Sequence, residues 1–137
     1  MEMPLSSFVE YLVLLLHQNH LPLPFQKREL WHSLFCGLKK MSEDALAPPF
    51  LKDLQFDPDG PYPKSKKLSA ILDMLCRTGC VYWTSPGRQQ YSLSDNVAML
   101  WLKEFNSLKE EEKTSLYIAL GLAREKFNSF GSSSVKK

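Results

Sequence analysis

Histidine and cysteine side chains, the usual protein ligands of zinc together with carboxylates, occur at helical spacing in two parts of the 137-residue chain. His32 precedes Cys36 by four positions, and Cys76 precedes Cys80 by four, so each pair would share a face of a continuous helix. Gly79 interrupts the second pair, because glycine commonly ends helices. We therefore expect buried thiols without a metal, and a zinc site is the alternative.

Other patterns that carry catalytic chemistry are missing from the sequence. The chain has no glycine-rich phosphate loop, no Gly-x-Ser-x-Gly motif and no His-Glu-x-x-His motif. His17 and His20 lie three positions apart, as two metal ligands would, but solvated side chains at a helix end explain them too. We expect neither an enzyme nor a bound cofactor.

Basic side chains are concentrated in one part of the sequence. Residues 61–94 carry five Lys or Arg against one acidic residue, whereas residues 1–60 carry five against eight. A local excess of positive charge attracts polyanions, and phosphate contacts dominate the affinity of proteins for nucleic acids. The alternative is that these side chains only keep a small domain soluble.

The basic stretch predicts a helix followed by a β-hairpin. Four apolar residues between positions 65 and 78 follow the spacing of one helical face: Leu68, Ile71, Leu72 and Leu75. Gly79 offers a stop in the left-handed conformation, and the pattern then changes to the alternation of a strand. We expect a hairpin from about Cys80 to Leu93 with its turn at Pro86 and Gly87.

This order of elements resembles the second half of a winged helix-turn-helix domain, as in regulators of the PadR and MarR kind. There, the recognition helix ends in Leu-x-x-Leu-x-x-x-Gly-x-Val, a charged hairpin follows, and the return strand contains Tyr-x-Leu-Thr. The matching residues are Leu72, Leu75, Gly79 and Val81, and then Tyr91-Ser92-Leu93-Ser94. The resemblance is confined to residues 64–94 and supports a fold more strongly than a function.

The resemblance implies a regulator of transcription with duplex DNA as its partner. The implied contacts are Lys64, Lys66, Lys67 and Ser69 at the recognition helix and Arg88 and Gln89 on the wing. Arg88 would reach a minor groove or a phosphate, unless it is only a solvated turn residue. Tyr82, Trp83 and Tyr91 could stack on bases, although cross-strand pairing is their commoner role in a hairpin.

Two helices are predicted before the basic stretch. The first covers residues 5–19, with Ser6 or Ser7 as its cap and Glu10 in the capping-box position. It is apolar on most of its surface, so it should lie at the centre of the fold. A proline-containing break separates it from a second helix over residues 25–40.

Residues 42–63 depart from the winged-helix pattern. Three or four residues usually join the two helices of a helix-turn-helix, but here about twenty intervene, five of them proline. The segment allows short helices at 42–46 and 50–54 and a turn at 57–60. Because it is acidic, this insertion could block a DNA groove or bind another ligand. The alternative function is therefore a winged-helix adaptor that binds protein and not DNA.

The hairpin is followed by two further predicted helices, one capped by Ser94 or Asp95 and a longer one that begins near Lys109 or Glu110. The longer helix has an apolar stripe at Leu116, Leu120, Ala123 and Phe127. Ile118 and Leu122 form a second stripe on a neighbouring face. Such a helix is either deeply wrapped or paired with a second copy. We expect a homodimer through it, as is common among the regulators that the chain resembles.

Composition bounds the size of the fold. An apolar content of 44% in 137 residues supplies one compact core, so we expect mainly helical structure with one small hairpin, in a single domain over residues 1–130. Residues 131–137 have little to bury and should be disordered. Three cysteines, an odd number, favour a reducing compartment, and the longest apolar runs are too short to span a bilayer. A cytoplasmic protein is expected.

Overall fold

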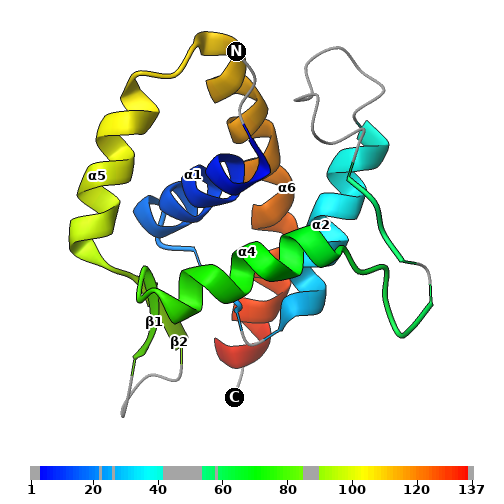
Figure 1. The fold of residues 1–137 in the computed structure, drawn as a ribbon. Coiled ribbons are helices and arrows are strands. Elements are labelled where there is room, and N and C mark those ends of the chain that lie inside the picture. The colour runs from blue at the N-terminus through cyan, green and yellow to red at the C-terminus, as the bar shows by residue number, and fades with distance from the viewer. Residues whose placement is uncertain are drawn as a thin grey trace.

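The computed structural model describes residues 4–21, 23–25, 27–41, 54–57, 59–84 and 90–135. The elements within these ranges are α1 (Leu5–Gln18), α2 (Arg28–Met41), α4 (Lys66–Arg77), β1 (Val81–Thr84), β2 (Gln90–Leu93), α5 (Asp95–Asn106) and α6 (Glu110–Val135), shown in Figure 1. The fold is mainly helical with a small two-stranded antiparallel sheet, as predicted. No helix of the described ranges has the length and hydropathy needed to cross a membrane.

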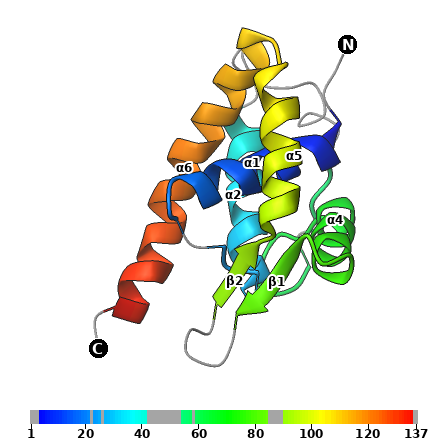
Figure 2. The ribbon, with the colours of Figure 1, turned by 90° about the vertical axis from the view of Figure 1, so that its left-hand side faces the viewer.

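Helix α1 lies at the centre of the fold because it is apolar around almost its whole circumference. Every residue from 8 to 16 is buried except Glu10, which confirms the prediction of a central helix. It contacts α4, α5, α6 and β2, and Figures 1 and 2 show these elements around it.

The predicted cap of α1 is wrong. The helix begins directly after Pro4, so Ser6 and Ser7 lie inside its first turn and no side chain caps it. The extended Pro4 carbonyl accepts a hydrogen bond from the Phe8 amide (3.1 Å), so the backbone alone starts the helix. Glu10 is half-buried instead of capping, and burial, followed by the charge of Glu104, raises the pKa of its carboxyl.

Helix α2 begins three residues later than predicted, because the chain before it is held by a different contact. The Trp31 indole N–H donates to the Pro24 carbonyl (3.1 Å), which keeps this segment folded back on the first turn of the helix. The Trp31 ring packs between Phe25 and Phe127 of α6, with centroids 4.9 Å away in both cases. The stripe predicted on α6 (Leu116, Leu120, Ala123 and Phe127) is buried, as expected.

Helix α6 also extends further than the composition predicts. It continues through Gly131 to Val135, into the segment for which we expect disorder. Extending an existing helix requires no new nucleation, so even serine can be accommodated at its end. Residues 136 and 137 lie outside the described ranges.

Helix α4 and the hairpin follow the predicted boundaries closely. Ser65 caps α4 by accepting a hydrogen bond from the Leu68 amide (3.3 Å). Gly79 ends the helix region with a φ of +79°. The strands pair with Val81 opposite Leu93, and both of these side chains are buried. The predicted turn at Pro86 and Gly87 lies outside the described residues.

Replacing Gly79 with alanine should lower the free energy of unfolding by about 1–2 kcal/mol, because the left-handed conformation strains any residue with a Cβ. The space around Gly79 is open, so strain and not a clash is the cause. Gly79→Asn should cost less, because asparagine tolerates this conformation. Denaturant unfolding followed by circular dichroism measures both, and an alanine variant as stable as the parent would contradict the expectation.

Candidate nucleic-acid interface

The first turn of α4 and the residue before its cap present three positive charges to solvent. Lys64, Lys66 and Lys67 are all exposed, and the first turn contains no acidic residue. A helix N-terminus already carries partial positive charge from its free amides, so lysines there oppose the helix dipole. A bound anion such as a phosphate relieves this repulsion.

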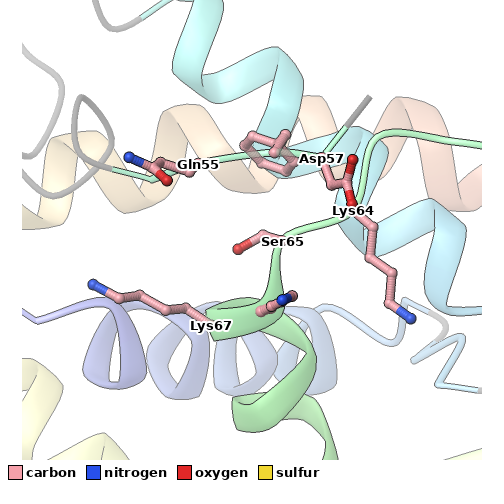
Figure 3. A pocket seen from close by; sticks show the side chains of 7 residues that line it. Gln55, Asp57, Lys64, Ser65 and Lys67 are labelled. Carbon is pink, nitrogen blue, oxygen red and sulfur yellow. The ribbon is translucent and has the colours of Figure 1, made fainter. Parts of the chain in front are cut away.

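These lysines border a pocket of about 500 Å³ between α4 and residues 54–57. Figure 3 shows Gln55 and Lys67 on opposite sides of this space, with the Ser65 hydroxyl between them. The backbones of Asp57 and Lys64 exchange two hydrogen bonds (2.8 and 3.2 Å), which hold the segment against the helix. The Asp57 carboxylate, which accepts the Asp59 amide at 3.0 Å, adds one negative charge beside the lysines.

His32 of α2 fixes the start of α4 from inside the fold. Its side chain is fully buried, and its Nδ1 accepts the Ser65 amide at 3.1 Å. Its Nε2 lies 3.2 Å from the Ser69 hydroxyl oxygen, and the Tyr62 ring lies 5.6 Å from its own ring. Because an N–H donates to Nδ1, the neutral ring must carry its proton on Nε2 and donate it to Ser69.

The surroundings of His32 keep it neutral. Burial, followed by the positive charges of Lys64 and Arg28, lowers its pKa from 6.5 to about 4. Since Nε2 is the donor, His32 cannot take a proton from Ser69 in this arrangement. The Ser69–His32 pair is therefore a positioning contact and not a nucleophile with its base.

The structure places the predicted DNA contacts in different surroundings. Lys64, Lys66 and Lys67 lie together at the rim of the pocket. Ser69 lies one turn further along α4, is half-buried and is engaged with His32. Arg88 and Gln89 lie outside the described residues, so the reach of the wing stays a prediction.

Asp73 is the one acidic residue of α4, and it is paired. The Arg28 guanidinium lies 2.7 Å from its carboxylate and also donates to the Phe25 carbonyl (2.8 Å). This ion pair neutralises the charge that would otherwise repel a phosphate backbone from the outer face of α4. Both side chains retain solvent contact, so the pair adds little to stability.

Three of the candidate zinc ligands, His32, Cys76 and Cys80, each contact different neighbouring side chains. Both ring nitrogens of His32 are engaged by serines, and Arg28 approaches the Cys76 sulfur at 3.9 Å. Burial raises the pKa of the Cys76 thiol, although Arg28 acts in the opposite direction. The Cys80 sulfur lies 3.4 Å from the Thr78 hydroxyl oxygen, which donates to the Met74 carbonyl at 2.8 Å. In the part of the chain that the structure describes, no three His, Cys, Asp or Glu side chains gather as a metal site.

Two of the three aromatic residues of the hairpin pair across the strands, as predicted for their structural role, whereas Tyr82 lies opposite Ser92. Trp83 lies opposite Tyr91 in the register, with ring centroids 5.0 Å apart and planes at 70°. The Tyr91 ring also packs against the Phe25 ring, with centroids 5.6 Å apart, and this contact attaches the hairpin to the core. Tyr82 and Trp83 nevertheless keep 48% and 43% of their surface exposed.

The chain matches no family model, no curated protein and no solved structure. The order of α4, β1 and β2 is compatible with a winged helix.

The role of His32 is a feature of the site that the sequence alone did not reveal. The only local signal is that a polar residue lies in the apolar stripe of α2, directly after the buried Trp31. Such a residue requires buried partners. Those partners, Ser65 and Ser69, lie 33 and 37 positions away, so no local pattern identifies them.

Proposed function

We propose that the chain is a winged-helix protein that binds duplex DNA and acts in transcriptional control, with α4 as its recognition helix. The observation that carries this proposal is the cluster of Lys64, Lys66 and Lys67 at an exposed helix N-terminus whose first turn has no carboxylate. Lysines and free amides together suit DNA phosphates, which position a protein on the duplex.

The outer face of α4 is free to approach a groove. Leu68, Leu72 and Leu75 bury one side of the helix against the core. The exposed residues at helical spacing on the other side are Lys66, Lys67, Ala70, Asp73 and Arg77. Ala70 leaves room for the helix backbone to come close, and Asp73 is neutralised by Arg28. Figure 2 shows α4 at the periphery of the fold, beside the hairpin.

Binding to mixed-sequence duplex DNA should weaken steeply with salt, because each neutralised phosphate releases condensed counterions. Fluorescence anisotropy over a salt series gives the slope of log affinity against log salt. Lys66→Ala and Lys67→Ala should each weaken binding and flatten that slope by about one unit. Lys103→Ala, at an exposed position on α5, is the matched control and should change neither value. The absence of binding at micromolar protein and low salt would refute the proposal.

A protein-binding adaptor is the second candidate function, and exposed apolar side chains favour it. Met99 and Leu100 of α5 are 72% and 56% exposed, and Tyr82 and Trp83 of the hairpin are also uncovered. Large uncovered apolar groups mark surfaces that bind proteins. If the chain is an adaptor, Met99→Ser and Leu100→Ser should abolish binding of its protein partner. Lys66→Ala and Lys67→Ala should then have little effect on that binding.

A further inference from the structure

Helix α6 has a continuous exposed seam about a third of a turn around the helix axis from its buried stripe. Its inner face packs on α1 and α2. The outer face carries exposed residues at alternating spacings of four and three: Glu110, Thr114, Tyr117, Gly121 and Arg124. This is the spacing that keeps one line of side chains in contact with a neighbouring helix. Figure 2 shows α6 along one edge of the described fold.

The middle of the seam is apolar. Tyr117 is 52% exposed and the adjacent Ile118 is 38% exposed. One edge of Tyr117 contacts Phe105 of α5, with ring centroids 6.1 Å apart, and this contact orients the ring. An oriented, half-covered tyrosine suits a protein interface, because it offers a large apolar surface and a polar tip.

Gly121 has no use within the described fold. Its missing side chain would meet no atom within 4 Å, and it is not among the glycines with a positive φ. Gly37 is different, because a Cβ there would lie 3.4 Å from the Leu122 side chain on α6, so this position faces the α2–α6 contact. An exposed glycine inside a helix weakens that helix. Close approach of another backbone is a reason for glycine at such a position.

The charges of the seam select a second copy of this chain as the occupant. Glu110 and Arg124 each lie seven positions from Tyr117, one on either side of it along the seam. If two α6 helices cross antiparallel at Tyr117, Glu110 of one copy faces Arg124 of the other. A parallel pair would place like charges together. We propose that α6 forms an antiparallel, two-fold symmetric homodimer that crosses at Tyr117, with a Gly121 residue in the interface on either side of the crossing.

The charge pairs can be tested by reversal and restoration. Analytical ultracentrifugation of the full chain should show a dimer, and Glu110→Arg or Arg124→Glu should each weaken its affinity by roughly tenfold or more. The double variant Glu110→Arg/Arg124→Glu should restore the dimer, because the reversed charges face each other again. Lys103→Glu on α5 is the control and should leave the affinity unchanged. Deleting α6 would not be a fair test, because Leu116, Leu120 and Phe127 belong to the core.

Gly121→Ala provides a test that cannot fail through misfolding. In an uncovered helix this change raises thermal stability. Within a close-packed pair it adds one methyl group to the interface on either side of the crossing point at Tyr117, so we expect a weaker dimer. The proposal is overturned if the parent stays monomeric up to millimolar concentration, if a dimer is indifferent to Gly121→Ala, or if the charge reversals are not restored in combination. None of these outcomes depends on DNA binding.

Discussion

The Trp31→Ala substitution should lower the free energy of unfolding by about 3–5 kcal/mol, the range found for large aromatic residues removed from protein cores. Trp31 is fully buried. Its ring joins Phe25 to Phe127 of α6, and its indole N–H satisfies the Pro24 carbonyl. Alanine would leave a cavity at this junction and a carbonyl without its partner. A domain of this size has a total stability of about 5–15 kcal/mol, so the loss is a large fraction.

Trp83→Ala is the matched control for this prediction. Trp83 is the same residue type but is 43% exposed and lies on the two-stranded hairpin. Its removal loses the cross-strand contact with Tyr91, worth about 1 kcal/mol or less. Denaturant unfolding followed by helical circular dichroism compares the two variants without relying on tryptophan fluorescence. Equal losses at the two positions would contradict the place of Trp31 in the core.

Local signals explain why α4, the hairpin and the inner stripe of α6 follow the predictions from sequence. Only a few neighbouring residues specify the end of the helix at Gly79 and the change from helical to strand periodicity. The three lysines of the candidate site are also neighbours in the sequence, so their proximity required no knowledge of the fold. The pocket beside them could not be predicted without the fold. Its other wall is formed by residues 55–57, which follow a segment with no periodic pattern.

Contacts between distant positions explain what the sequence did not predict. The Arg28–Asp73 ion pair spans 45 positions, and it neutralises the charge of the acidic residue on α4. The start of α2 depends on Trp31 and the Pro24 carbonyl, whereas periodicity alone placed it at residue 25. The predicted short helices at 42–46 and 50–54 concern positions that, apart from Leu54, lie outside the described residues.

The stability of the protein should fall by up to about 3 kcal/mol as the pH decreases from about 6.5 to about 4, through the titration of His32. The folded state lowers the pKa of His32, so within this window the unfolded chain binds a proton that the folded chain rejects. The stabilisation is therefore complete above pH 6.5 and lost as the pH falls towards 4. Protonation would place an N–H on Nδ1 directly against the Ser65 amide, which donates to that atom.

Comparison with His32→Asn isolates this effect from other groups. The asparagine Oδ1 can take the place of Nδ1 and accept the Ser65 amide, but it does not titrate, so the pH dependence between 6.5 and 4 should flatten. The comparison is needed because the raised pKa of Glu10 acts with the opposite sign, stabilising the fold as the pH falls. His20→Asn makes the same substitution at an exposed position with a positive φ, which asparagine tolerates, and is the matched control. A His32→Asn variant with the full slope of the parent would show that His32 is not held neutral by the fold.

Lys64→Ala should shift the His32 transition to higher pH, because the Lys64 charge helps to lower the pKa of His32.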